Sequence, residues 1–265
     1  MRQPSYYLCH GGGPWPWLQG PLRESLRGLE RGLQAIPRQL PEEPRAVLVV
    51  SAHWEEPVFT VTTASQPGMV YDYFGFPPET YAIRYPSTGS PPLAERVTAL
   101  LESSGLVACG SADRGYDHGS YSVLQTLYPQ AQVPVVQLSL KAGLDPLEHL
   151  RAGRALAPLR DEGVLIIGSG MSCHERGPDM GMRSVAFDDW LQQTLVMQDS
   201  ATRWTALCEW TRAPEARAVH PREDHLIPLM VAAGAALEDP AECIYRERLM
   251  GFIAVSSYRF GECPE

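Results

Sequence analysis

The sequence predicts an α/β fold in which a central, mostly parallel or mixed β-sheet is covered by helices on both faces. Short runs rich in β-branched residues alternate along the chain with segments in which leucine recurs every three or four residues. The runs are too apolar for strands with one face in water, and such alternation is typical of a sandwiched sheet. No linker rich in Ser, Gly or charged residues divides the chain, so we expect one domain over residues 1–265.

The expected strands are a first short run, SYYLC, and four longer ones. They cover residues 5–9, 45–52, 133–140, 163–170 and 251–258. Each reads as a continuous apolar run, as expected for strands that are buried on both faces.

The expected helices carry an apolar stripe, and several begin at Pro or end at Gly. They cover residues 21–36, 91–105, 145–163 and 225–237. Two stretches rich in Pro and Gly, 64–91 and 168–183, are expected to be long loops. Open α/β sheets bind ligands in loops at the carboxyl ends of their strands.

Charge and composition exclude several classes of partner. A net charge of −9 argues against nucleic acid and anionic membranes, which are bound through clustered Lys and Arg. No apolar run approaches the roughly 20 residues that cross a bilayer, and the N-terminus lacks the pattern of a signal peptide. We therefore expect a cytoplasmic monomer or small homo-oligomer that acts on a small molecule.

The cysteines show no CxxC pair and no disulfide framework, so reduced thiols are expected. They are Cys9, Cys109, Cys173, Cys208, Cys243 and Cys263. Cys9 precedes His10 on the first expected strand, where neighbouring side chains point to opposite faces, so we assign it a packing role.

The seven histidines are the most informative residues because three of them end apolar runs. His10, His53 and His174 follow expected strands, whose carboxyl ends meet at one edge of a parallel sheet. His118 stands at the expected start of a helix, and two more bracket a short segment before another helix, His220 and His225. Neutral imidazole suits Zn, Fe, Cu and Ni, and three protein ligands with open positions are typical of a catalytic metal centre.

Other motifs of catalysis are missing from the sequence. It contains no HExxH, the GSG at 168–170 is not a GxSxG motif, and no Walker or GxGxxG pattern follows the glycines after His10. His149, on an amphipathic segment, is expected at the surface or at a helix-packing edge.

Ordered motifs run nearly from end to end: CHGGGP, VVSAHWE, YDYFGFPPETYAIRYPSTGSP, GYDHGSYSVLQTLYPQAQVPVVQLSL, LIIGSGMSCHERG, HPREDHLIPLMVAAGAA and SSYRFG. In these motifs the chain resembles the DODA-type, LigB-like class III extradiol ring-opening dioxygenases. The resemblance implies that both atoms of O2 are inserted into a catechol, 4,5-DOPA-like or related, to give a ring-opened semialdehyde. It also implies one divalent metal, Fe(II) for activity, with Zn(II) able to occupy the isolated protein.

The resemblance also implies roles for individual residues. The metal ligands are His10, His53 and His225, with Glu223 as a weaker competitor for the third position. His174 takes the position of the catalytic acid/base, also described as a fourth ligand, and His118 that of a histidine near substrate or oxygen. The alternatives are a zinc-dependent hydrolase on a similar scaffold and, less favoured, a metal-binding protein without catalysis.

Substrate contacts are expected from aromatic residues, above all Trp15 and Tyr258, since planar substrates gain from stacking. Further candidates for this wall are Trp17, Trp54, Tyr73 and Phe76, and Arg84 and Arg222 are candidates to bind a substrate carboxylate. The chain departs from its relatives at HGGGPWPW, where they commonly read HGSP, and at His174-Glu175, where they often read His-Asn.

Overall fold

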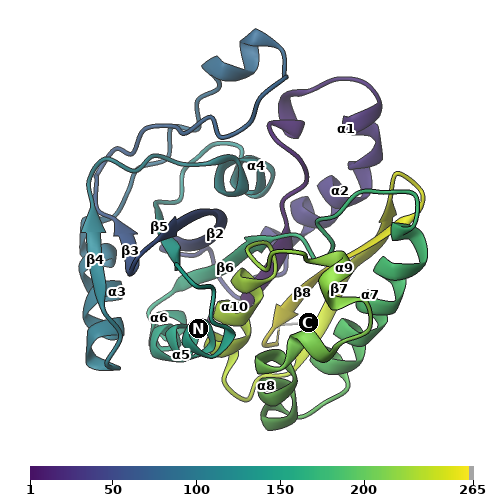
Figure 1. The fold of residues 1–265 in the computed structure, drawn as a ribbon. Coiled ribbons are helices and arrows are strands. Elements are labelled where there is room, and N and C mark those ends of the chain that lie inside the picture. The colour runs from purple at the N-terminus through teal and green to yellow at the C-terminus, as the bar shows by residue number, and fades with distance from the viewer. Residues whose placement is uncertain (263–265) are drawn as a thin grey trace.

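The described part of the chain, residues 1–262 of the computed structural model, contains one eight-stranded mixed sheet (Figure 1). Its strand order is β4-β3-β5-β2-β6-β1-β8-β7. The strands are β1 (Ser5–Cys9), β2 (Ala46–Glu56), β3 (Phe59–Thr62), β4 (Ala108–Ser111), β5 (Val135–Lys141), β6 (Val164–Gly170), β7 (Ala241–Leu249) and β8 (Ile253–Phe260). The four central strands β5, β2, β6 and β1 are parallel, and β3 and β8 run antiparallel to their neighbours in this centre.

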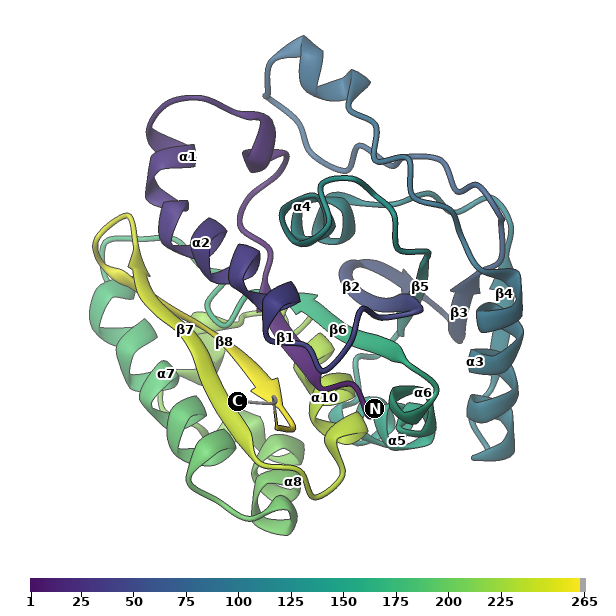
Figure 2. The same cartoon turned by 180° about the vertical axis from the view of Figure 1, so that it is seen from behind.

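Helices cover both faces of the sheet, which confirms the predicted fold class. On one face α4 (His118–Leu127) packs on β2 and β6, and α2 (Arg27–Ala35) packs on α4 and β7 (Figure 2). On the other face α10 (Ile227–Ala236) packs on β6, β1 and α5 (Pro146–Leu156), while α7 (Met180–Val196) covers β8. The remaining helices are α1 (Pro21–Ser25), α3 (Pro91–Ser103), α6 (Pro158–Asp161), α8 (Ser200–Cys208) and α9 (Ala216–Val219).

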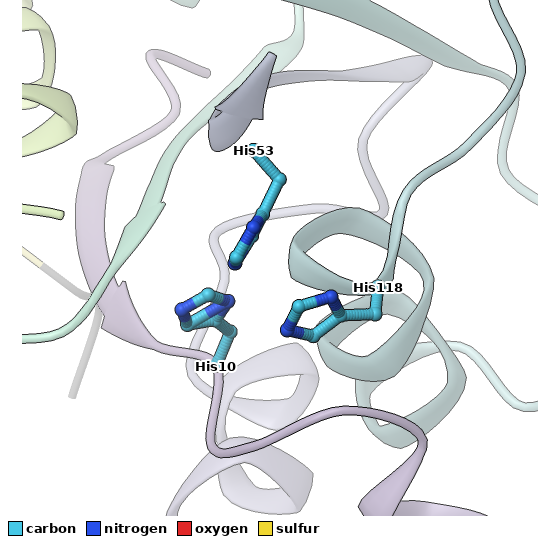
Figure 3. Close-up of side chains that lie close together, drawn as sticks. All are labelled: His10, His53 and His118. Carbon is cyan, nitrogen blue, oxygen red and sulfur yellow. The ribbon is translucent and has the colours of Figure 1, made fainter. Parts of the chain in front are cut away.

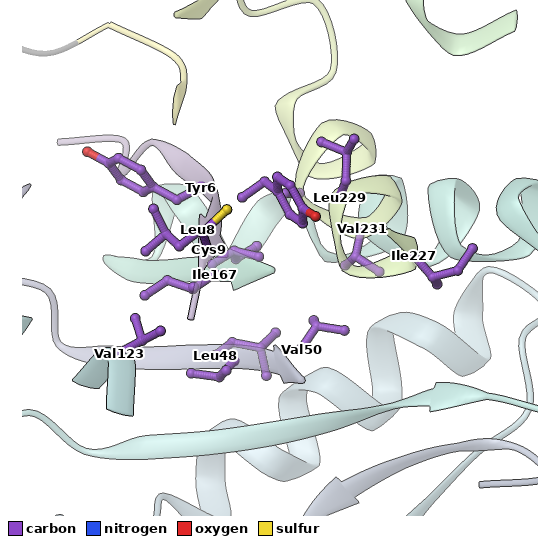
Figure 4. Close-up of a cluster of buried hydrophobic side chains, with 14 of the residues drawn as sticks. Tyr6, Leu8, Cys9, Leu48, Val50, Val123, Ile167, Ile227, Leu229 and Val231 are labelled. Carbon is purple, nitrogen blue, oxygen red and sulfur yellow. The ribbon is translucent and has the colours of Figure 1, made fainter. Parts of the chain in front are cut away.

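The core lies between the central strands and these two helical layers (Figure 4). All residues of β1 and β6 are buried, as their continuous apolar runs predict. Leu8, Leu48 and Ile167 are fully buried side chains, and burial of each contributes about 1.5–3 kcal/mol relative to exposure. The rigid centre of the sheet is therefore also where the strands deliver their histidines.

Several boundaries differ from those predicted. The helix expected over 21–36 is divided at Leu26 into α1 and α2, and that over 145–163 is divided before Pro158, which has no N–H to continue the ladder. Strand β2 continues past the predicted end at residue 52, so His53 lies inside it. The loop expected over 168–183 ends earlier, because α7 begins at Met180.

None of the described helices is long and apolar enough to cross a membrane. The cysteines of residues 1–262 are free thiols, and Cys263 lies outside the described residues. Cys9 is fully buried and donates to the carbonyl of Ser256 at 3.2 Å.

Candidate active site

A cavity of about 420 Å³ lies at the carboxyl ends of β1, β2 and β6. Five histidines from distant parts of the sequence line it: His10, His53, His118, His174 and His225. Aromatic side chains (Tyr73, Phe74, Phe76) and charged ones (Asp72, Glu175, Arg176) complete much of the wall. The structure thus brings together all five histidines that were predicted as site residues.

His10 is held at the end of β1 by contacts of its own backbone. Its N–H donates to the carbonyl of Gly170 at 3.0 Å, and its carbonyl accepts from Trp15 Nε1 at 2.7 Å. Gly11 has φ of +76°, and a Cβ there would lie 2.7 Å from the Trp15 ring. The glycine is needed because both the conformation and the close approach exclude a side chain.

His53 projects from an irregular part of β2. From Val50 to Glu55 the strand advances by five residues while its partner β5 advances by two, from Leu138 to Leu140. Extra residues in one strand bend it and redirect side chains, and such bulges are common next to active sites. The backbone N–H of His53 donates to Ser51 Oγ at 3.2 Å, which holds the bulge in place.

His225 stands just before α10 and is fixed through its carbonyl oxygen. That oxygen accepts from Tyr7 Oη at 2.9 Å and from the N–H of Met171 at 3.1 Å. A Cβ at Gly170 would lie 2.1 Å from the same oxygen, so only glycine lets the two backbones approach so closely. The strands that carry the other histidines therefore also place this one.

His118 occupies the first turn of α4, which the sequence predicted. Asp117 caps this helix by accepting from the N–H of Ser120 at 3.1 Å. The carboxylate of Asp72 accepts from the backbone N–H of His118 at 3.1 Å and faces its ring Nδ1 at 2.9 Å. His118 is consequently held at both its backbone and its ring.

The imidazoles of His10, His53 and His118 lie close together and point toward one another (Figure 3). His225 lies beside His53. The Nε2 atoms of His53 and His225 are 3.3 Å apart. On the far side of each ring, Nδ1 faces a carboxylate oxygen, Asp72 Oδ2 at 3.3 Å for His53 and Asp224 Oδ2 at 3.2 Å for His225. A carboxylate only accepts, so it favours the proton of each ring on Nδ1 and a lone pair on each Nε2. Both contacts are electrostatic at these distances, and Nδ1 of His225 makes no hydrogen bond within the described residues.

Two lone pairs that point at each other need a cation between them. Tetrahedral bonds of 2.0–2.1 Å separate two ligand nitrogens by about 3.3 Å, the distance found here. Within the described residues neither ring nitrogen of the buried His10 has a hydrogen-bond partner. Imidazoles backed by carboxylates, together with an unpartnered buried imidazole, fit a transition-metal ion.

Comparison with known proteins agrees with this arrangement. The family described as the catalytic LigB subunit of aromatic ring-opening dioxygenase matches residues 5–261. The chain belongs to the LigB family. It is therefore an extradiol ring-cleaving dioxygenase, and members of this family depend on a metal.

Relatives of this LigB-family enzyme cover most of its length. A 4,5-DOPA dioxygenase extradiol from Portulaca grandiflora is 39% identical over 83% of each chain. The protein of the same name from Escherichia coli is 32% identical over 88% of this chain and 85% of its own. The crystal structure of an uncharacterized protein, JW3007 from Escherichia coli K12, superimposes with a TM-score of 0.78 at 28% identity and covers 98% of this chain and all of that one. These findings favour the dioxygenase prediction, and none supports the hydrolase.

The geometry adds a second candidate for the third ligand in the LigB-family site. His10, His53 and His118 each offer one ring nitrogen, and these three atoms lie within 4.8 Å of one another. His225, the predicted ligand, is instead the histidine whose Nε2 faces that of His53. His118 has its Nδ1 bound to Asp72, so it too presents Nε2 as a lone pair.

Desolvation in the cavity favours the neutral form of His10, His53 and His174. It lowers the pKa of His10 and of His53 well below the ordinary value, and neighbouring histidines lower each further. The pKa of His174 falls to about 4, through burial and then through His225, on which its ring stacks at 3.7 Å. Neutral rings are the form in which histidine binds metals or accepts protons.

Trp15 and Tyr258, predicted to bind substrate, are not brought to the cavity. Both are fully buried and neither lines it. The Trp15 ring instead fills the space beside Gly11 and bonds to His10, while Tyr258 lies within β8. Trp17 and Trp54 also lie outside the lining, whereas Tyr73 and Phe76 belong to it.

The structure also places elsewhere the polar residues that were expected to bind substrate or metal. Arg222 is paired with Glu55 and Asp224, Arg84 lies outside the cavity lining, and Glu223 is outside it and paired with Arg217. Arg176, which the sequence reasoning missed, is the cavity's one Lys or Arg side chain among the described residues.

The other two histidines, His220 and His149, do not line the cavity and make structural contacts instead. His220 is buried, and its Nε2 lies 3.0 Å from the carbonyl of Ser172, which steadies the loop that carries His174. Of the two positions expected for His149, the surface or a helix-packing edge, the first is wrong: the side chain is fully buried on α5, and its ring lies edge-on to Phe59. The N–H of Lys141 donates to its Nε2, and its Nδ1 faces the carbonyl of Asp145.

Proposed function

We propose that this enzyme holds one divalent metal, Fe(II) for activity, through His10, His53 and His225, and cleaves a catechol that carries a carboxylate. The observation that carries the metal site is the 3.3 Å separation of the Nε2 atoms of His53 and His225. Held by these three residues, a ferrous ion would supply a common binding point for a catechol and O2 and would lower the pKa of the diol. Both oxygen atoms enter the product, and the ring carbon–carbon bond beside the diol breaks.

His118 and His174 are proposed to move the protons. Both line the cavity, and each is held by a neighbour, His118 by Asp72 and His174 by stacking on His225. With Nδ1 of His118 bound to Asp72, its Nε2 is the atom that accepts a proton from the catechol. The ring of Tyr73 lies 6.0 Å from that of His118, so an aromatic substrate that enters here meets an aromatic wall.

The carboxylate of the proposed substrate is assigned to Arg176. Its guanidinium lies beside Gly12, and no ion pair joins it to an acidic side chain in the described part of the chain. Glu175, which also lines the cavity, would suit an ammonium group. An amino-acid catechol such as 4,5-DOPA meets both requirements, and several relatives bear that substrate in their names. We also propose that the enzyme acts in the cytoplasm as a monomer or small homo-oligomer.

The test is reconstitution under anaerobic conditions. Enzyme freed of metal is loaded with Fe(II) or Zn(II), mixed with a panel of catechols and then exposed to air. Ring opening gives a yellow semialdehyde, with one O2 consumed for each catechol. The proposal expects this product with Fe(II) and carboxylated catechols. Colourless mixtures with unchanged O2 in every case, or hydrolysis of esters by the Zn(II) form, would refute it.

A further inference from the structure

Asp72 joins two histidines that have different roles in the proposed reaction. We propose that it is a positioning residue whose single carboxylate orients His53 toward the metal and His118 toward the substrate. The two roles, metal ligand for His53 and proton acceptor for His118, come from the proposed function, and the inference rests on it for them. The contacts of Asp72 with the two rings are part of the structure itself.

The two carboxylate oxygens of Asp72 divide between the two rings. Oδ1 lies 2.9 Å from Nδ1 of His118 and 3.1 Å from its backbone N–H, and Oδ2 lies 3.3 Å from Nδ1 of His53. The ring centroids of the two histidines are only 4.0 Å apart. One anion therefore fixes the proton of both imidazoles on Nδ1 and turns both Nε2 lone pairs toward the cavity.

The segment that carries Asp72 is anchored on both sides. Before it, the N–H of Val70 donates to the carbonyl of Tyr116 at 2.7 Å. The hydroxyl of Tyr71, also before it, donates to the carbonyl of Ile83, and after it the hydroxyl of Tyr73 donates to the carbonyl of Thr80, each at 2.7 Å. The side chain of Asp72 is 18% exposed, so solvent competes little for its oxygens. These contacts hold the Asp72 carboxylate in position.

The same anchored segment forms part of the cavity wall. Tyr73, Phe74 and Phe76 line the cavity a few residues beyond Asp72. The segment that carries the orienting carboxylate therefore also supplies part of the aromatic wall of the cavity. No other carboxylate in the described chain contacts His53 or His118.

Substitution of Asp72 by Asn removes one half of this arrangement. An amide presents one acceptor oxygen, so it can serve one N–H, while its NH2 group faces the other. We expect D72N to bind Zn(II) about 10–100-fold more weakly in a competition with a chelator, the range for loss of an outer partner of a ligand. At saturating Fe(II), kcat should fall by more than KM changes, because His118 also loses its orientation.

The control is D113N, which removes a carboxylate from an exposed position ahead of α4 with no bond to an imidazole. It should bind Zn(II) like the wild type. Equal Zn(II) affinity in D72N, D113N and the wild type, with equal melting temperatures, would overturn the proposal. If the wild type cleaves no catechol but D72N alone loses Zn(II) affinity, the positioning role of Asp72 is supported and the proposed substrate reaction is refuted.

A measurement on the unaltered enzyme covers the case in which D72N does not fold. Long-range ¹H–¹⁵N spectra of the histidine rings report which nitrogen carries the proton. We expect the Nδ1–H tautomer for both His53 and His118 in the Zn(II)-loaded wild type. An Nε2–H tautomer of either ring would contradict the proposed role of Asp72.

Discussion

The Nε2 atoms of His53 and His225 lie 3.3 Å apart although 172 positions separate the two residues in the chain. Each ring has a carboxylate behind its Nδ1, so each lone pair faces the other. The ring of His53 comes from a bulge in β2, and that of His225 comes from the turn just before α10. The pair belongs to the proposed set of His10, His53 and His225, whereas the alternative set has His118 in place of His225.

Alanine variants should decide which histidine is the third ligand. H225A is expected to lose far more than the roughly 100-fold in metal affinity that an outer partner costs, because it removes a bond to the metal itself. H118A should retain the metal and lose turnover. Metal content after dialysis and turnover at saturating Fe(II) are the measurements. The reverse pattern would instead favour the His10, His53 and His118 set.

Gly119 is expected to tolerate no side chain, since it lies against two of the proposed ligands, His10 and His53. A Cβ there would be 2.7 Å from Ser51 Oγ, 2.9 Å from His53 Cδ2 and 3.1 Å from His10 Nδ1. G119A should therefore displace the imidazoles and weaken Zn(II) binding at least tenfold. The matched control is G181A in α7, where the nearest atom is 3.8 Å away. That change should leave metal binding intact, and equal affinities in the two variants would contradict the expectation.

The fold was largely predictable because its central strands are buried on both faces and read as apolar runs. The strands β3, β4 and β7 were not predicted. Two of them, β3 and β4, have four residues each, and β7 is a half-exposed edge strand, so none shows a long apolar run. Helix boundaries also shifted where a proline or a local turn interrupts an amphipathic segment.

The site was predictable in part for the same reason. Histidines at strand ends converge once the strands are parallel, whereas the bulge that aims His53 depends on pairing with β5. The direction of a side chain was harder to read. Trp15 lies close to His10 in the sequence, yet its ring turns into the core and its N–H holds the His10 carbonyl. Asp72 stood within a quoted motif, but only the fold shows which rings it meets.

Arg176 should determine the preference for charged substrates. In R176Q we expect KM for a carboxylated catechol to rise about tenfold, in keeping with the loss of one hydrogen bond to a charged group at an exposed position. KM for 4-methylcatechol should not change. R84Q removes an exposed arginine outside the cavity and serves as the control. Equal KM values for the carboxylated catechol in R176Q and the wild type would remove Arg176 from substrate binding.

His149 should make the stability of the protein depend on pH. Its burial lowers the pKa to about 4 in the folded state, below the ordinary value of 6.5. The unfolded chain therefore binds a proton at a higher pH than the folded protein, and acidification favours unfolding. This contribution is fully present above pH 6.5 and is lost as the pH falls toward 4.

The variant H149Q isolates this effect, because the other histidines are common to both proteins. At pH 7.5 the variant should be less stable, since the two hydrogen bonds of the ring, to Lys141 and Asp145, are disturbed. Between pH 6.5 and pH 4 the wild type should lose up to about 3 kcal/mol that the variant does not lose, so the difference between them narrows. Urea unfolding of the metal-free proteins at a series of pH values measures it. Two parallel curves would mean that His149 keeps its ordinary pKa in the fold.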